Sequence, residues 1–469
     1  IRGEKDEEWE EANCGKPCHF LADKRPPCTE TINVFGDKSI KHTHLPKEFL
    51  EGAKRLEETL PPCSSGTWPF EDMWDDKGNR REPDERRDIA ARFFESLQEK
   101  VSLIFYYCNY DNPITGNEKK YLLTGIARLK EKQRTFKKWP QIPKDVAEKY
   151  GDFVWSFTLQ NGYPDEGVRI PYQEYLDMNL DVSSIAVVVS GDLTRRFKYV
   201  SRHVSDDEAI GLIDQAIRSI KRIIQHGHLK NGRVDWERKL EWLKDIRSEC
   251  WESRGLYPGL ASTLAYLNFP EPELYVRIEL PKKQPKDPRE YIFERLDGKV
   301  KMEPAERDRY GSAIERYQTL KNSPTTAIVT RLCRERFPFF DLTEEQVKNI
   351  LGDSREQYLI TSSLGEIFDN PYCLCEEYTG QDIDDTLGFH RIDHGMIPSE
   401  DLGKDVFRIA LDDPRRLRAL MVDFLRSAAN DGHTFLDRSD LFALVEQWHK
   451  ENDPAGHFIL DKAIWEQYR

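Results

Sequence analysis

Residues 412–436 read DDPRRLRALMVDFLRSAANDGHTFL, and the rest of the chain can be interpreted outward from this stretch. Asp412 and Asp413 are residue types that cap helices, and Pro414 suits a first helical turn because its ring fixes φ and its missing N–H needs no partner there. Apolar side chains then recur at helical spacing, which predicts one buried face. These are Leu417, Leu420, Met421, Phe424, Leu425 and Ala428. Arg415, Arg416, Arg418 and Arg426 are expected largely off that face.

The residues after this helix predict a short strand and a second helix. Asn430-Asp431-Gly432 is a stop signal, His433–Leu436 is short and strand-like, and Asp437 can cap a further helix. A helix, a turn, a short strand and a second helix are how a winged helix-turn-helix begins. We therefore predict that residues 406–469 form a winged-helix-like segment.

Composition limits the class of protein. A chain of 469 residues is long enough for about three domains, and 38% hydrophobic residues supply cores for them. The net charge of −14 argues against a coat of non-specific DNA-binding charge but leaves room for local basic patches. No apolar run approaches the ~18 residues of a membrane helix, and no signal peptide is recognisable. Nine scattered cysteines indicate a reduced compartment, so we expect a cytoplasmic protein.

Residues 1–85 are irregular and rich in cysteine and histidine. Cys14, Cys18, Cys28 and Cys63 lie near His19, His42 and His44. Thiolate and imidazole ligands suit zinc, so the four cysteines are a candidate metal site. The spacing of Cys14 and Cys18 is loose and no second clean pair follows, so scattered structural cysteines are the alternative.

Residues 86–200 are predicted to form a β-rich domain after a helix at 89–97. Strands are expected at 100–110, 121–131, 153–160 and 168–172, because these segments are rich in β-branched and aromatic residues. The first two strands resemble the opening hairpin of PUA-like and EVE-like small barrels, which often bind an unusual nucleobase. A barrel with a purely structural role is the alternative.

Residues 201–280 are predicted to be helical, with helices at 206–227 and 236–251. Pro258-Gly259 then separates two helices in the manner of a helix-hairpin-helix, whose glycine lets the backbone come close to a phosphate. Such a hairpin binds phosphate without reading sequence. The alternative is a simple Pro-Gly break between helices of a bundle.

Residues 281–405 are predicted to be a second helical, hairpin-like domain. It begins with a polar connector at 281–288, continues as a helix at 304–321, and includes a helical unit at 339–353 opened by a capping box of Thr343 and Gln346. His390, Asp393 and His394 are expected close together in a turn, as a metal site or as a hydrogen-bonded loop. The fold class is therefore α+β and multidomain: a small barrel-like domain, helical hairpin units and a winged-helix-like end.

Several segments in order resemble the region that precedes the motor of RecD-like superfamily 1 DNA helicases. They are SLIFYYCNYDNPI, YLLTGIARLK, FVWSFTLQNGYPDEGVRIPYQEYLD, FKYVSRHVSDDEAI, SRGLYPGLASTLAYL, DNPYCLCEEYTG and RLRALMVDFLRSAANDGHTFL, spread over residues 101–436. The resemblance implies an accessory DNA-handling role in loading, guiding or splitting strands, in repair or in defence against phage. It implies single-stranded or forked DNA as the partner. The implied DNA contacts are Arg254, Tyr257, Pro258, Gly259, Leu260, Arg415, Arg416, Arg418, His433 and Thr434.

No G-x-x-x-x-G-K-[ST] phosphate loop occurs in the chain. The ATP- and magnesium-dependent motor is therefore expected beyond Arg469 or on a separate polypeptide, and no catalytic residue is assigned. The alternative function is a modified-base reader or a metal-dependent nuclease built from residues 1–200. A lone HxKx4D pattern at His228, Lys230 and Asp235 is interpreted as a chance match, because that nuclease chemistry needs two such motifs.

Overall fold

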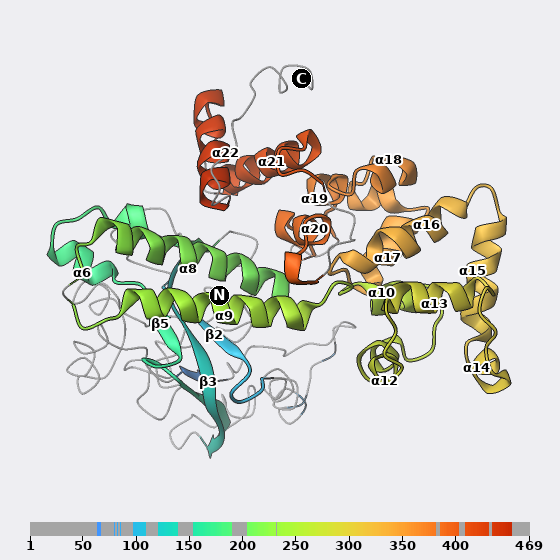
Figure 1. The fold of residues 1–469 in the computed structure, drawn as a ribbon, viewed down its shortest axis with the longest axis horizontal. Coiled ribbons are helices and arrows are strands. Elements are labelled where there is room, and N and C mark those ends of the chain that lie inside the picture. Colours follow the sequence, from blue (N-terminus) through green and yellow to red (C-terminus); the bar gives the residue numbers. More distant parts are fainter. Residues whose placement is uncertain are drawn as a thin grey trace. The chain divides into compact units, whose positions relative to one another are not determined.

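The computed structural model describes residues 97–108, 121–138, 153–189, 204–230, 232–380, 385–402, 409–430 and 434–452, the strand Cys63–Gly66, and the single residues Asn79, Glu82 and Glu85. The chain divides into two compact units (Figure 1). Unit 1 comprises residues 1–204 and 212–247, and unit 2 comprises residues 205–211 and 248–469. The class is mixed α and β: the described residues form many helices and one small antiparallel sheet.

The sheet of unit 1 is organised by one long strand. All pairings in it are antiparallel, and β3 bonds to β2, β4, β5 and β6. The strands are β1 (Cys63–Gly66), β2 (Leu103–Cys108), β3 (Tyr121–Lys138), β4 (Phe153–Asn161), β5 (Gly167–Arg169) and β6 (Val188–Val189). Strand β3 serves so many partners because its 18 residues exceed the length of each of them. Phe105 lies opposite Ile126 in the β2–β3 pair, so the hairpin predicted from the sequence is confirmed.

The predicted barrel is not seen as a closed sheet in the described residues. The strand order is β1-β4-β3-β2, and no pairing among the described strands joins β1 to β2. The short segment predicted as a strand at 168–172 also ends early, because α6 (Tyr172–Asp177) begins there. The helix predicted at 89–97 lies outside the described residues except for Leu97.

Buried aromatic and aliphatic side chains form the core of unit 1. Tyr172 is fully buried; its hydroxyl donates to the carbonyl of Leu123, 2.9 Å away, and accepts from the backbone N–H of Val187. The 3₁₀ helix η2 (Val182–Ile185) is held from α8, because the Ser219 hydroxyl donates to the Ile185 carbonyl at 2.7 Å. Helices α8 (Asp206–His226) and α9 (Trp236–Arg254) confirm the two helices predicted there, and each contributes residues to both units.

In the described residues, unit 2 is built mostly from short helices around one hydrophobic cluster that extends from Leu260 to Val445. They are α10 (Leu260–Tyr266), α11 (Pro272–Leu274), the π-helix η3 (Tyr275–Glu279), α12 (Leu280–Lys282), α13 (Pro288–Leu296), α14 (Pro304–Arg309), α15 (Gly311–Asn322), α16 (Ala327–Glu335), η4 (Phe337–Phe339), α17 (Glu344–Leu351), η5 (Arg355–Tyr358), α18 (Leu364–Asp369), α19 (Cys373–Glu377), α20 (Phe389–Met396), η6 (Glu400–Leu402), α21 (Pro414–Asn430) and α22 (Arg438–Asn452). The predicted boundaries at 280/281 and 405/406 therefore fall within one compact unit in the described part of the chain.

Local signals in the sequence of unit 2 are confirmed in detail. Thr343 and Gln346 form the predicted capping box at the start of α17. Pro414 is the first residue of α21, and that helix ends at Asn430, the first residue of the predicted stop signal. The predicted wing is not present in the described residues: 434–436 are irregular instead of a strand, and Phe435 is 76% exposed.

None of the described helices is both long enough and apolar enough to cross a membrane.

Candidate functional site

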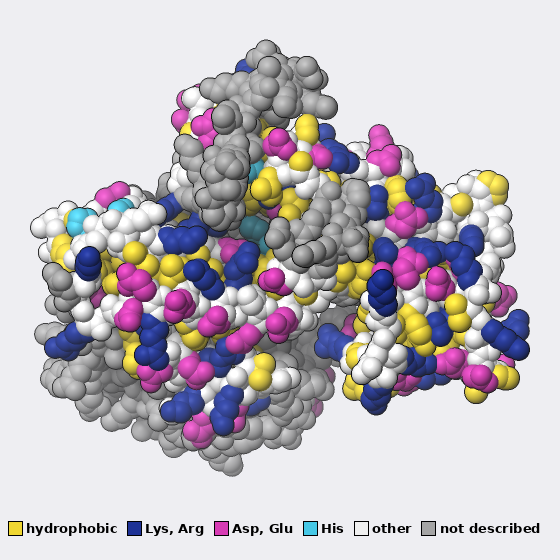
Figure 2. Space-filling view, viewed as in Figure 1, with side chains coloured by type: hydrophobic (Ala, Val, Ile, Leu, Met, Phe, Trp, Pro, Cys, Tyr) yellow, Lys and Arg dark blue, Asp and Glu magenta, His cyan; other side chains and the backbone are white. Residues whose placement is uncertain are grey.

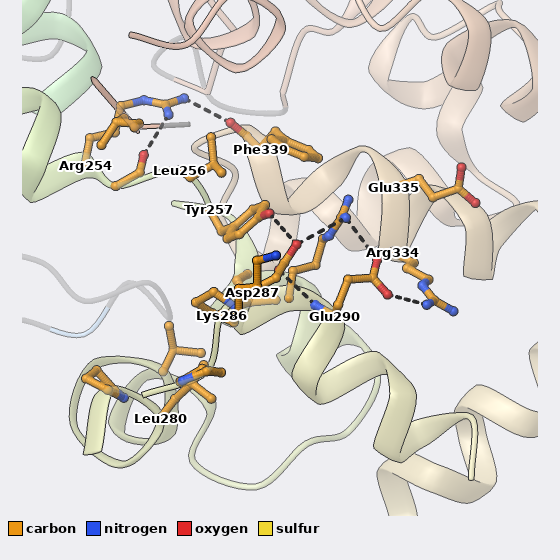
Figure 3. A pocket seen from close by; sticks show the side chains of 18 of the residues that line it. Arg254, Leu256, Tyr257, Leu280, Lys286, Asp287, Glu290, Arg334, Glu335 and Phe339 are labelled. Atoms are coloured by element: carbon orange, nitrogen blue, oxygen red, sulfur yellow. Dashed lines mark hydrogen bonds and ion pairs between the residues drawn. The ribbon is translucent and has the colours of Figure 1, made fainter. Parts of the chain in front are cut away.

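Unit 2 contains a pocket of about 1360 Å³ (Figure 3). Its walls come from the loop between α9 and α10, from α12 and the connector to α13, from the first turn of α13, and from the end of α16 with η4. The lining residues include Arg254, Leu256, Tyr257, Leu260, Leu280, Lys286, Asp287, Arg289, Glu290, Arg334, Glu335, Arg336 and Phe339. Three of the residues predicted to contact DNA, Arg254, Tyr257 and Leu260, are thus brought to one wall.

Two aromatic rings and a guanidinium group form the centre of this wall. The rings of Tyr257 and Phe339 meet edge to face with centroids 5.0 Å apart (Figure 3). The guanidinium of Arg289 lies 5.5 Å from the Tyr257 centroid and 5.3 Å from that of Phe339. The Tyr257 hydroxyl donates to Asp287 at 3.0 Å. Burial raises the pKa of the Tyr257 phenol well above its ordinary value, so the ring stays neutral at physiological pH.

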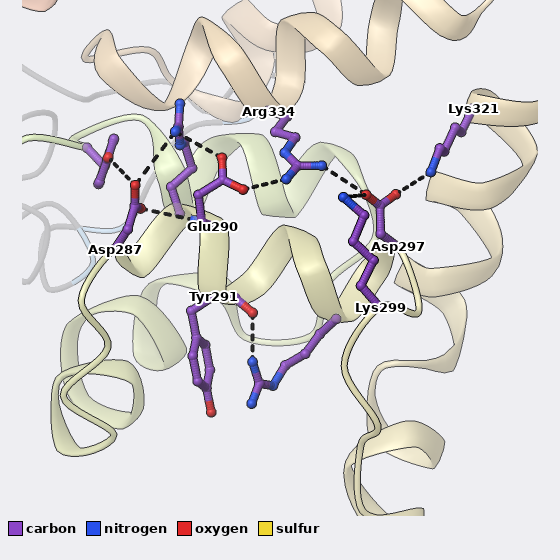
Figure 4. Close-up of polar contacts among 10 residues, drawn as sticks. Asp287, Glu290, Tyr291, Asp297, Lys299, Lys321 and Arg334 are labelled. Carbon is purple, nitrogen blue, oxygen red and sulfur yellow. Dashed lines mark hydrogen bonds and ion pairs between the residues drawn. The ribbon is translucent and has the colours of Figure 1, made fainter. Parts of the chain in front are cut away.

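A row of alternating charges follows α13 away from the pocket (Figure 4). Asp287 caps the helix by accepting the backbone N–H of Glu290 at 3.0 Å. Glu290 pairs with Arg289 at 2.9 Å and also with Arg334, whose second nitrogen donates to Asp297 at 2.9 Å. Most cations near the pocket are therefore neutralised by fixed carboxylates, and the row holds α13 against α16.

In the part of the chain that the structure describes, two positive side chains at the pocket, Lys286 and Arg289, lack an ion-pair partner or a hydrogen-bond acceptor. The side chain of Lys286 is exposed and has no ion-pair partner among the described residues. The Nε of Arg289 is buried without a hydrogen-bond acceptor. Such an unsatisfied donor costs about 1–3 kcal/mol. Five basic residues (Arg254, Lys286, Arg289, Arg334, Arg336) and three acidic ones (Asp287, Glu290, Glu335) line the pocket, but Arg254 and Arg334 also pair with Asp207 and Asp297, which do not line it.

The structure corrects the role expected for Arg254. Its side chain is almost completely buried, and its Nε donates to the Asp207 carboxylate at 2.6 Å. A second nitrogen donates to the Phe339 carbonyl at 3.0 Å. A guanidinium held in this way fixes the wall of the pocket and is not offered to a phosphate.

The role expected for Gly259 is corrected as well. Its N–H donates to the Pro338 carbonyl at 3.0 Å, so it is not free for a phosphate. Its φ of −88° is ordinary for any residue. Glycine is needed for space, because a Cβ there would lie 2.1 Å from the Phe340 carbonyl oxygen and 2.4 Å from that of Phe337. The residue with a left-handed backbone is Gly255, at φ +65°, where α9 ends. Pro258-Gly259 is thus a close-packed break between helices, which was the alternative interpretation.

The arginines at the start of α21 are also held in contacts within unit 2. Arg416, expected off the apolar face, is 3% exposed and pairs with Asp393 through 2.7 and 2.9 Å bonds. Arg415 is paired with Asp413 at 2.7 Å, and Arg418 is paired with Glu376 at 3.0 Å. Thr434 is exposed, and His433 lies outside the described residues. The buried Arg416 cannot reach a phosphate, and Arg415 and Arg418 already have anionic partners.

Metal ligation receives no support from the described residues. Cys14, Cys18 and Cys28 lie outside them, and only the backbone of Cys63 is described. In the described part of the chain no group of three or more His, Cys, Asp or Glu side chains is arranged to hold a metal ion. His390, Asp393 and His394 lie on helix α20 instead of in a turn, and His394 Nδ1 is 2.7 Å from Asp207.

The carboxyl groups around Asp207 give a prediction on pH. Burial, with a smaller contribution from the charge of Asp207, raises the pKa of Asp341 above its ordinary value. Because the pKa of Asp341 is higher in the folded than in the unfolded state, its ionised side chain lowers the free energy of unfolding at neutral pH. This loss of stability disappears as the pH falls below the unfolded-state pKa of about 3.9. We expect Asp341→Asn to raise the melting temperature at pH 7 and to give no gain at pH 3. The exposed Asp353→Asn is the matched control, and a lower melting temperature of Asp341→Asn at pH 7 would contradict the assignment.

Most of the pocket is not predictable from the sequence. The polar stretch Pro281–Pro288 is predicted as a connector, but it holds Lys286 and Asp287, and α13 begins in it. The order Asp-Pro-x-Glu at 287–290 is a helix-start signal that could have located α13. No local signal indicates that Arg289 meets Phe339, because the two residues are brought together only by tertiary packing.

Comparisons with known proteins assign no activity. No family model matches the chain, and no solved structure matches it. An uncharacterised protein of the archaeon Methanocaldococcus jannaschii is 22% identical over 383 residues, which cover 73% of this chain and 29% of that protein. The chain thus spans less than a third of the length of this relative.

Proposed function

We propose that this chain is a DNA-binding region of a RecD-like DNA helicase that guides or separates strands for an ATP-driven motor. Its 469 residues hold no phosphate loop of their own. The sequence basis of the proposal is the ordered resemblance to the pre-motor region of that family.

One structural observation carries the proposal further. Tyr257 and Leu260, which the resemblance marks, line a large pocket whose wall combines aromatic rings with the exposed Lys286, which has no ion-pair partner among the described residues. Aromatic faces beside positive charge are the usual means of holding single-stranded nucleic acid, because bases stack and phosphates need neutralising.

The distribution of charged side chains on unit 2 favours a local contact with a few phosphates of DNA over a contact along a whole duplex. Lys, Arg, Asp and Glu side chains are interspersed on the visible face of unit 2, without one continuous basic surface (Figure 2). A duplex bound along such a surface would meet as much repulsion as attraction. A few phosphates of an unpaired strand are a better fit to this pattern.

We expect the full chain to bind forked or single-stranded-tailed DNA more tightly than blunt duplex of the same length. Each phosphate contact with a single strand contributes about −0.7 to the slope of log K against log salt. Two to four contacts therefore predict a loss of roughly sevenfold to fiftyfold in affinity for a fourfold increase in salt. Fluorescence anisotropy with labelled oligonucleotides at 50 and 200 mM salt measures both quantities. The proposal would be rejected if the chain bound none of these DNAs, or if its affinity for them did not depend on salt.

A further inference from the structure

We propose that the pocket of unit 2 takes one unpaired nucleotide, with its base against Tyr257 and Phe339 and its phosphate at Lys286 and Arg289. This inference rests on the proposed DNA-binding function and specifies where and how the strand is held. The ligand chemistry is an aromatic base that carries a phosphate, and an unpaired nucleotide of a DNA strand is one source. A free nucleotide is the other.

The aromatic pair supplies a surface for a base. Tyr257 comes from the loop between α9 and α10, whereas Phe339 comes from η4, about 80 residues later, so the pair is fixed by the fold and not by one flexible loop. The edge-to-face contact of 5.0 Å leaves the two rings at an angle of 63°, which gives the pocket a rigid corner. The guanidinium of Arg289 lies over both rings, so a base must stack on the ring surface that this guanidinium leaves uncovered.

The positive groups are placed for a phosphate beside that corner. Lys286 and Arg289 flank the capping Asp287-Pro288 pair, and both line the pocket. Arg289 has an Nε without an acceptor, and Lys286 has no carboxylate partner among the described residues. Tyr257, Arg289 and Arg334 already engage Asp287 and Glu290, so Lys286 supplies the unpaired positive charge and Arg289 offers a phosphate only its Nε–H (Figures 3 and 4).

The size and the remaining walls agree with this ligand. A cavity of about 1360 Å³ exceeds the ~300–1,000 Å³ of most small-ligand sites, so a nucleotide can enter with part of the chain that carries it. Leu256, Leu260, Val276 and Leu280 add apolar surface, which suits a base or a sugar better than a compact inorganic ion.

The test of the base contact uses Tyr257→Leu, with Tyr257→Phe as its matched control. A 2-aminopurine placed at successive positions of the single-stranded tail reports stacking by loss of fluorescence. We expect quenching at one or two positions with the wild type and with Tyr257→Phe, which keeps the ring. Tyr257→Leu should abolish this quenching and weaken binding of tailed DNA by about tenfold, within the range for loss of one base stack. Blunt-duplex affinity should change by less than about twofold.

The test of the phosphate contact uses Lys286→Ala, with the exposed Lys301→Ala as its control. Loss of one phosphate contact should reduce the magnitude of the salt slope for tailed DNA by about 0.7 in Lys286→Ala and leave it unchanged in Lys301→Ala. Melting curves of all four variants show whether each remains folded. Both lysines are exposed, so neither change should affect folding.

The outcomes separate the two proposals. If no DNA binds, the proposed function fails together with this inference. If tailed DNA binds but neither Tyr257→Leu nor Lys286→Ala changes quenching, affinity or salt slope, the DNA-binding proposal stands and the pocket is excluded as its site. Titration with free 2-aminopurine deoxyribonucleoside monophosphate shows whether the pocket takes a free nucleotide or one in a DNA strand. Quenching at micromolar concentration that Tyr257→Leu removes would assign the pocket to a free nucleotide and would contradict the proposal that it holds a nucleotide of a strand.

Discussion

Replacement of Gly259 by valine is expected to unfold unit 2. The added Cβ would lie 2.1 and 2.4 Å from the carbonyl oxygens of Phe340 and Phe337, distances that no side chain tolerates. These carbonyls belong to the backbone of a buried turn, so they cannot move aside as a flexible side chain would. We expect a loss above about 3 kcal/mol, the upper end for overpacking a core, measured as a lower melting temperature and a smaller soluble fraction.

Gly255→Ala is the matched control for this change. Gly255 has a left-handed backbone, but apart from its two chain neighbours no residue has an atom within 4 Å of the position that its Cβ would take. The left-handed conformation alone costs about 1–2 kcal/mol. A Gly259→Val protein that melts like the wild type but has lost DNA binding would contradict this account. It would instead support the interpretation of Pro258-Gly259 as a phosphate-binding hairpin.

The neighbouring contacts explain why this turn tolerates so little change. Gly395 of α20 approaches the same turn, and a Cβ on it would lie 2.6 Å from the Phe339 carbonyl oxygen. The buried Arg254 donates to that same oxygen. Segments that are separated by more than a hundred residues therefore meet at η4, and Phe339 presents its ring to the pocket from there.

Features set by nearby residues were predictable from the sequence. The capping box of Thr343 and Gln346, Pro414 at the start of α21, and the β2–β3 hairpin each depend on residues close together in the chain. Turn, cap and periodicity rules describe such local interactions well. The break between α9 and α10 at Pro258-Gly259 was located correctly for the same reason.

Features set by distant partners were not predictable in this way. Arg254 and Arg416 look like surface cations in the sequence, because nothing nearby shows that Asp207 and Asp393 will neutralise them. The pocket depends on segments near 257, 287 and 337, and neither charge nor periodicity within each segment indicates the others. Buried arginine is rare unless it is paired, so an exposed position was the better expectation without the partner in view.

The second large effect is expected at the pair of Asp393 and Arg416. Both side chains are more than nine-tenths buried, two hydrogen bonds join them, and the Tyr372 hydroxyl donates to Asp393 at 2.7 Å. Burial alone would raise the pKa of Asp393, but the charge and hydrogen bonds of Arg416 outweigh it and lower that pKa. The stabilisation is therefore complete at neutral pH and is lost only as the pH falls below about 3.9.

We expect Asp393→Leu to lower the free energy of unfolding at pH 7 by about 3–5 kcal/mol, because it leaves the Arg416 guanidinium buried without a counter-charge. Lys348→Leu on α17 is the control for loss of an exposed ion pair. The side chains of Lys348 and its partner Glu344 are 57% and 47% exposed, and exposed pairs contribute about 0–1 kcal/mol. The double variant Asp393→Leu with Arg416→Met should recover at least half of the loss, since it removes the stranded charge. Equal losses in the single and the double variant would show that α20 and α21 are held by apolar packing, with no net contribution from this ion pair.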